Sequence, residues 1–157
     1  LGIEKHIEAF EKDHDDYNSI MLKALADRLA EALAEYLHER VRTSYWGYSK
    51  NERHSNEELI QEKYRGIRPA PGYPACPDHT EKIGLFNILN VKDNIGVDLT
   101  ESLAMTPASS VSGWYFAHPN SKYFGVGKVS MEQIKDITVR KNVKLQDIEK
   151  WYSSILI

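Results

Sequence analysis

Residues 65–82 read RGIRPAPGYPACPDHTEK and contain the side chains best suited to binding a small charged ligand. Arg68 carries a planar guanidinium fork that matches the two oxygens of a carboxylate. Ala70 and Gly72 offer peptide groups that are expected to be free, and Tyr73 offers an aromatic wall. This combination of groups favours a binding site for a ligand that carries a carboxylate.

Three prolines, Pro69, Pro71 and Pro74, make this stretch stiff. Each proline fixes its own φ angle and biases the residue before it away from helix, so residues 68–74, the arch, must be extended or turning. A stiff loop loses little conformational entropy when a ligand binds. Proline content alone favours the alternative that this stretch is a structural connector. The combination of arginine, glycine and tyrosine in it favours a binding site.

Other clusters do not complete a chemical site. Cys76 and His79 have the spacing of half a zinc site, but the second half would have to come from His54 or His118, since there is no second cysteine. The acidic cluster DHDDY at residues 13–17 is more typical of a helix cap than of a cation site. We therefore predict no metal.

No pair of residues has the pattern of an acid with a base, or of a nucleophile with a base. GVG at residues 125–127 lacks the third glycine of a dinucleotide motif, and SVSGW lacks the first glycine of a nucleophile elbow. Glu31, Glu35 and Glu39 lie one helical turn apart and favour a surface stripe, although one of them could face a ligand ammonium. By pattern alone, four aromatic residues favour sheet core over a binding wall: Trp114, Tyr115, Phe116 and Tyr123.

The elements that must position these residues begin with a long amphipathic helix over 16–45. Its apolar stripe consists of Met21, Leu25, Leu29, Leu33, Leu37 and Val41, and it is widened by Ala24, Ala32 and Tyr36. Ser55 and Glu58 have capping-box spacing, which predicts a short helix to about Lys63. A further helix is expected over 78–91, with Asp78 as its N-cap and with Ile83, Phe86, Ile88 and Leu89 available for burial.

Three segments after this helix, DLTESLAM, SVSGWYFAHP and SKYFGVGKV, are rich in strand-forming residues. We expect three antiparallel strands, with the aromatic runs on either side of the HPNS turn paired together. Helical spacing returns over 131–141, with a stop at Lys141–Asn142, and again from Leu145. Helices around a small antiparallel sheet make an α+β fold.

Composition limits the class of protein. The 157 residues, 41% hydrophobic, suit one domain, and the net charge of −3 gives no basic field for nucleic acid. No apolar run reaches the roughly 20 residues of a membrane span. A single cysteine fits a cytoplasmic protein. The first residue is Leu1, which suggests part of a longer chain.

The stretches RGIRPAPGYPACPDHTEK, LTESLAMTPASSVSGWYFAHPNSKYFGVGKV and LADRLAEALAEYLHERVR resemble the C-terminal activation domain of cobalamin-dependent methionine synthase. The likeness runs from about Asp15 to the C-terminus. The family domain is about twice this length, so residues 1–157 are expected to be one activation-type domain that corresponds to its C-terminal half. The resemblance implies a twisted antiparallel β-sheet flanked by helices, and a shallow ligand site.

The family implies a function in methionine biosynthesis. Methionine synthase is a methyltransferase that uses vitamin B12 (cobalamin), whose cobalt is occasionally oxidised to inactive Co(II). Reactivation needs an electron from flavodoxin or another flavoprotein and a methyl group from S-adenosylmethionine bound to the activation domain. Cobalamin is held on a partner domain, and zinc is expected only elsewhere in the full enzyme. The isolated chain is expected to have no turnover of its own.

The resemblance also implies roles for individual residues. Arg68 would pair with the carboxylate of S-adenosylmethionine, and Ala70 and Tyr73 would add backbone and ring contacts, with Gly72 beside them. Glu31 would be the acidic partner of the ligand, and Tyr123 would close the pocket. An acidic residue from the N-terminal half of the family domain has no counterpart here.

Two other functions remain open from the sequence. A docking or regulatory remnant would bind a cobalamin domain or flavodoxin without binding S-adenosylmethionine. A free-standing methyltransferase is disfavoured, because neither a nucleotide-binding signature nor a catalytic pair is present. The sequence does not identify the reductase or the oligomeric state.

Overall fold

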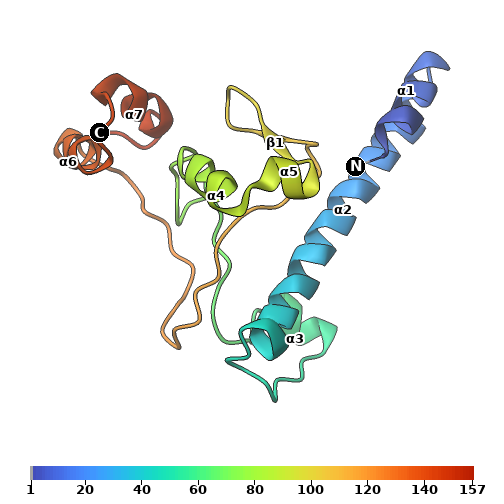
Figure 1. The fold of residues 1–157 in the computed structure, drawn as a ribbon, viewed down its shortest axis with the longest axis horizontal. Coiled ribbons are helices and arrows are strands. Elements are labelled where there is room, and N and C mark those ends of the chain that lie inside the picture. Colours follow the sequence, from blue (N-terminus) through green and yellow to red (C-terminus); the bar gives the residue numbers. More distant parts are fainter. Residues whose placement is uncertain (1) are drawn as a thin grey trace. The chain divides into compact units, whose positions relative to one another are not determined.

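The computed structural model describes residues 2–157, which form two compact units. The first unit comprises Leu1–Arg65 and Phe86–Val111, and the second comprises Gly66–Leu85 and Ser112–Ile157. Figure 1 shows a mainly helical chain with long irregular connections. The α+β class is confirmed, with a sheet of only two short strands. Across the described residues, no helix combines the length and apolar character needed to cross a membrane.

The first unit begins with a helical hairpin. Helix α1 (Glu4–Lys12) folds back along α2 (Asp16–Arg40), which continues into a π-helical turn, η1 (Val41–Tyr45). The Asp15 side chain accepts a hydrogen bond of 3.0 Å from the Asn18 N–H and so caps α2. The long helix and the capping role of the 13–17 cluster are therefore confirmed, whereas α1 was not predicted.

The predicted apolar stripe of α2 is exposed. Leu25 and Leu29 are 53% and 71% exposed, and the fully buried positions of the helix are Ser19 and His38. A period of 3.6 residues identifies a face whose burial would be favourable, but it does not supply the element that covers that face.

A buried pair of charged side chains lies just after the end of α2. Arg42 is fully buried, donates from Nε to Glu52 Oε1 at 2.7 Å, and places its guanidinium 4.0 Å from the ring centre of Tyr64. Helix α3 (Asn56–Ile60) follows with the predicted capping box of Ser55 and Glu58. It is shorter than expected and ends before Lys63.

Two helices and a hairpin complete the first unit. Helix α4 (Glu81–Leu89) crosses the boundary between the units and is followed by α5 (Val91–Ile95). The predicted helix over 78–91 is interrupted because Asn90 adopts a left-handed conformation. Three of the four side chains expected to be buried are instead exposed: Ile83 46%, Ile88 84% and Leu89 55%.

The hairpin pairs β1 (Asp98–Leu99) with β2 (Met105–Thr106) in antiparallel register. The segment DLTESLAM was predicted to be one strand and instead supplies β1, the turn and the start of β2. The Thr100 N–H donates to Ala104 O at 2.8 Å, and the Leu103 N–H donates to Thr100 O at 2.9 Å, so the chain reverses within the segment.

The second unit has a small apolar core between its last two helices. Helix α6 (Met131–Lys141) ends at the predicted stop, with Asn142 as its C-cap. It starts at a capping box of Ser130 and Gln133, which was not predicted. Helix α7 (Leu145–Tyr152) packs beside it. The buried members of this core are Val129, Ile134, Ile148 and Tyr152.

The other two predicted strands are irregular. The HPNS turn forms, with the Ser121 N–H donating to His118 O at 2.9 Å, but the aromatic runs beside it do not pair with each other. Phe116 instead forms an isolated antiparallel bridge with Ile67. The expectation of sheet core also fails for two of the four aromatic residues, since Phe116 is 50% and Tyr123 40% exposed.

Candidate functional site

The arch is held as an extended chain by pairing with residues 114–116. Ile67 and Phe116 exchange two backbone hydrogen bonds of 3.0 Å, and the Trp114 N–H donates to Pro69 O at 3.0 Å. Gly113 permits this close approach, because a Cβ atom there would lie 2.6 Å from Pro69 O. A proline has no N–H to donate, so the stretch is anchored through its carbonyls and through Ile67.

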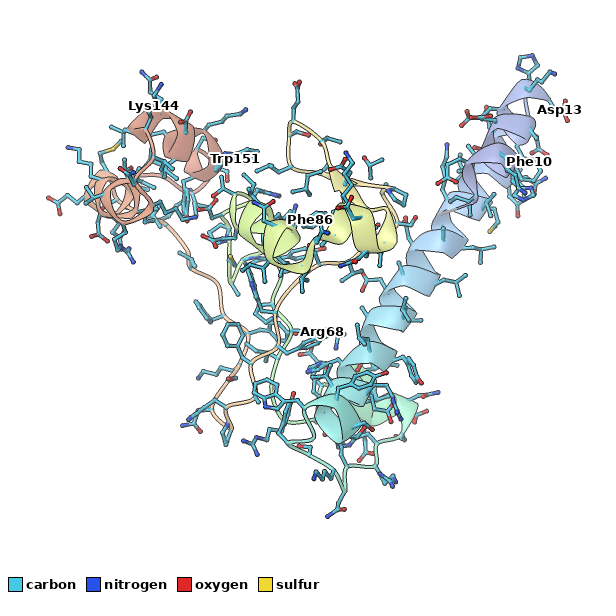
Figure 2. The ribbon with its side chains drawn as sticks, viewed as in Figure 1. Phe10, Asp13, Arg68, Phe86, Lys144 and Trp151 are labelled. Carbon is cyan, nitrogen blue, oxygen red and sulfur yellow. The ribbon has the colours of Figure 1, made fainter. Side chains whose placement is uncertain are left out.

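Arg68 and Tyr123 meet in the structure although 55 residues separate them. The Arg68 N–H donates to the Tyr123 hydroxyl at 3.0 Å. Arg68, which is labelled in Figure 2, is half-buried. The backbone N–H and C=O of Ala70 have no hydrogen-bond partner among residues 2–157. The structure therefore brings together two predicted ligand residues beside a peptide that is free to bind.

A tight turn ends the arch. The Gly72 N–H donates to Cys76 O at 2.7 Å, and the Cys76 N–H donates to Tyr73 O at 2.9 Å. Gly72 has a φ of +93°, which favours glycine. The N–H of Gly72 is therefore not free for a ligand, contrary to expectation, and its role in the turn is conformational. Tyr73 projects from this turn and is 63% exposed.

Glu31 belongs to the other unit. It lies on α2, where its side chain is exposed, as is that of Glu39, while Glu35 is half-buried. This arrangement agrees with the stripe interpretation for Glu31 and Glu39.

A buried ion cluster fixes the chain just after the arch. Lys141 on α6 donates to Asp78 Oδ2 at 2.6 Å and also contacts Glu81, and Asp78 Oδ1 accepts from the Thr80 N–H and hydroxyl at 2.8 and 2.6 Å. The Asp78 side chain is 3% exposed. Asp78 was predicted to cap α4, but α4 begins three residues later.

These contacts set the charges of the cluster. Burial acts to raise the pKa of the Asp78 carboxyl, but hydrogen bonds from Lys141 and Thr80 outweigh burial and hold this pKa below its ordinary value. Burial acts to lower the pKa of Lys141, yet hydrogen bonds to Asp78 and Glu81 raise it. Both groups are therefore charged at neutral pH.

Cys76 and His79 lie near this cluster without forming a metal site. Within the described part of the chain, no group of three or more His, Cys, Asp or Glu side chains is placed to hold a metal ion. Burial, and then the negative charges of Glu81 and Asp78, raise the pKa of the Cys76 thiol, which makes it a poor nucleophile at neutral pH.

A cavity of about 1040 Å³ opens on the other face of the extended segments. Ile67, Pro69 and Phe124 line it, whereas Arg68 and Tyr123 do not. Neighbouring side chains of an extended chain point to opposite faces, so the predicted ligand residues face away from the cavity. The cavity is mostly apolar, and its charged residues include Asp136 and Arg140, which pair at 2.6 Å.

The arrangement is suited to binding rather than to acid–base chemistry. The arch combines a guanidinium, a free peptide and the exposed ring of Tyr73, and Tyr123 adds a second exposed ring beside it. Sequence reasoning missed Gly113 and Lys141 as residues that shape this site. No local pattern could have identified Lys141, because its partner Asp78 is 63 residues away.

Two comparisons with known proteins agree with the sequence likeness. A family model described as "Vitamin B12 dependent methionine synthase, activation domain" matches residues 1–142. The crystal structure of the MetH reactivation domain bound to AdoHcy is 58% identical in sequence and superposes with a TM-score of 0.97. The match covers 99% of this chain and 48% of that chain, so this chain spans about half the length of the solved protein.

Proposed function

The chain belongs to the family of activation domains of vitamin B12-dependent methionine synthases, and from this premise we propose that it binds S-adenosylmethionine at the arch and presents the methyl group to a cobalamin on another domain. The observation that carries the proposal is the hydrogen bond between the Arg68 backbone and Tyr123, which joins the two ligand residues. The 58% identical relative, bound to the demethylated product, supports the ligand class.

Each residue of the arch has a role in this proposal. The Arg68 guanidinium pairs with the ligand carboxylate as a bidentate fork, and its backbone is held by the Tyr123 hydroxyl. The free peptide of Ala70 hydrogen-bonds the ligand, and Tyr73 and Tyr123 offer rings to its nucleoside. Glu31 is proposed as the partner of the positive charge of the ligand.

The contribution of the chain to reactivation is positioning. In this family the cobalamin accepts the methyl group after an electron from flavodoxin or another flavoprotein has reduced it. The described residues of this chain supply neither an acid–base pair nor a nucleophile, so they act by holding the sulfonium methyl in reach of a partner domain. We therefore expect no turnover by the isolated chain, and we expect it to act in the cytoplasm.

We further propose that the chain corresponds to the C-terminal part of a domain about twice its length. The match to 48% of the solved relative supports this proposal. So does the exposed stripe of α2, because covering a large apolar side chain contributes about 1.5–3 kcal/mol.

Calorimetric titration with S-adenosylmethionine tests the binding proposal. Arg68→Ala should weaken binding at least tenfold, because it removes a charge-assisted, bidentate contact. Arg140→Ala is the matched control, since it also removes an arginine but on the cavity face, and it should leave the affinity unchanged. The reverse pattern would place the ligand in the cavity and would contradict the proposal.

A docking module is the second candidate function, and the exposed apolar stripe of α2 is the observation that favours it. Such a module would associate with a cobalamin domain or flavodoxin and would not respond to S-adenosylmethionine. Sedimentation of a mixture with a cobalamin domain, with and without the nucleoside, separates the two functions.

A further inference from the structure

The imidazole of His79 lies directly against Gly72. A Cβ atom built on Gly72 would be 2.3 Å from Cε1 of His79 and 2.7 and 2.8 Å from the two ring nitrogens. The His79 ring fills the space that a side chain at residue 72 would need, so the ring packs directly against the glycine backbone. His79 is therefore the direct neighbour of the residue that begins the turn of the arch.

That turn determines where Tyr73 points. Two backbone hydrogen bonds, from the Gly72 N–H to Cys76 O and from the Cys76 N–H to Tyr73 O, fix the backbone on both sides of Tyr73. The Tyr73 side chain is 63% exposed. A third backbone hydrogen bond, from the Val126 N–H to Pro74 O at 2.9 Å, ties the far side of the turn to residues 125–127. At Gly72 the turn is supported by packing. The contact beneath Gly72 is the His79 ring.

The ring is held from two helices. It makes a tilted contact with Trp151 of α7, with ring centres 5.4 Å apart and an interplanar angle of 39° (Trp151 is labelled in Figure 2). Lys82 of α4, which is buried, places Nζ 3.1 Å from His79 Nδ1. Trp151 in turn packs against the core of α6 and α7. A continuous set of contacts therefore runs from this core to the turn of the arch.

We propose that His79 is a positioning residue for the ligand of the arch, which transmits the rigidity of the α6–α7 core to the Gly72–Tyr73 turn. The inference rests on the proposed function. Without the ring, a space opens beside Gly72, whose backbone can then sample other conformations. The ligand must order the turn on binding, and its affinity falls.

The charges around His79 give this role a pH dependence. Burial, and then the positive charge of Lys82, lower the pKa of His79, whereas the negative charge of Asp78 acts to raise it. Lys150 lies over the ring of Trp151, which contacts His79. Neutral Nδ1 can accept a hydrogen bond from Lys82, whereas a protonated ring would place two cations 3.1 Å apart. A lowered pKa means that the neutral ring stabilises the turn above about pH 6.5 and that this stabilisation is lost as the pH falls through the folded-state pKa.

The test uses S-adenosylhomocysteine as the probe and calorimetry with the whole chain. His79→Ala should bind at least tenfold more weakly than the wild type, and the matched control His6→Ala, an exposed histidine of the other unit, should bind normally. His79→Phe keeps a ring against Trp151, so it should recover most of the affinity at pH 7.5. It should also lose the weakening that the wild type shows as the pH falls through the lowered folded-state pKa of His79.

Amide hydrogen exchange separates positioning from unfolding. In His79→Ala the amides of Gly72 and Cys76 should exchange faster, while those of Ile134 and Ile148 in the core should not change. Equal affinity of His79→Ala and His6→Ala would overturn the inference, as would faster exchange throughout α6 and α7. If the wild type itself fails to bind, the proposed function fails and this inference fails with it, whereas wild-type binding retained by His79→Ala overturns this inference alone.

Discussion

Replacing Lys141 with methionine should destabilise the second unit by about 2–3 kcal/mol. Lys141 is the only charged donor to Asp78 Oδ2 among the described residues, at 2.6 Å, and the Asp78 side chain is 3% exposed. Breaking a buried pair costs about 3–5 kcal/mol, since the remaining charge is desolvated without a partner. The Lys141 side chain is 28% exposed, so solvent reduces the penalty towards the lower end.

The assay is amide exchange of Ile134, which lies in the core of this unit and reports its opening free energy. Lys135→Met on the same helix is the control, because Lys135 is exposed and should shift the free energy by less than about 0.5 kcal/mol. Adding Asp78→Asn to Lys141→Met removes the unpaired charge and should recover at least half of the loss. A Lys141→Met variant within 0.5 kcal/mol of the control would refute the reasoning.

The same pair predicts the pH limits of stability. The lowered pKa of Asp78 stabilises the fold above the unfolded-state value near 4, and this contribution is lost as the pH falls through the folded-state pKa. The raised pKa of Lys141 stabilises the fold fully below the unfolded-state value near 10.4, and this contribution is lost as the pH rises through the folded-state pKa. When the unfolding free energy is measured by amide exchange at several pH values, Lys141→Met should not show the loss of stability at alkaline pH. A loss that persists in this variant would show that other groups cause it.

Four further substitutions test individual contacts and backbone positions. Gly72→Ala should weaken S-adenosylhomocysteine binding more than tenfold, because the φ of Gly72 is +93° and His79 lies where the added methyl group would go. Gly84→Ala in α4 should instead raise the free energy of unfolding by about 0.5–1 kcal/mol, because a Cβ atom at Gly84 would meet no atom within 4 Å. Tyr123→Phe should weaken binding about fivefold in calorimetry, because the Arg68 N–H loses a hydrogen bond of about 1 kcal/mol; unchanged affinity would contradict that role. Arg42→Met should lower the urea-unfolding free energy of the first unit by about 3–5 kcal/mol, and a loss under 1 kcal/mol would show that Glu52 is solvated.

Local sequence signals predicted most of the helices and where they begin. Ser55 with Glu58 gave a capping box as expected, and α6 ended at Asn142 in the left-handed conformation that stops helices. Both signals act within four residues, so the sequence alone carries them.

Long-range features could not be predicted in the same way. Phe116 had no local reason to pair with Ile67 instead of the neighbouring aromatic run, because strand pairing depends on which backbone is brought alongside. The Leu25–Leu29 face of α2 was correctly identified as apolar, but its cover is not determined by the helix itself.

The candidate site shows the same division. Proline restrictions predicted a stiff, non-helical arch around Arg68, and the structure agrees. The free N–H expected at Gly72 is used by the turn, and Tyr123 meets Arg68 only through the tertiary fold. The ligand roles themselves came from the family resemblance and not from spacing.

The most direct test of the central claim is a map of amide shifts on adding S-adenosylhomocysteine to the labelled chain. The account predicts that the amides of Arg68, Ala70 and Tyr73 shift most, with that of Ala70 moving to a hydrogen-bonded position. The amides of Ile137 and Arg140, whose residues line the cavity on the opposite face, should stay in place. Shifts confined to Ile137 and Arg140, or none at saturating ligand, would contradict the account.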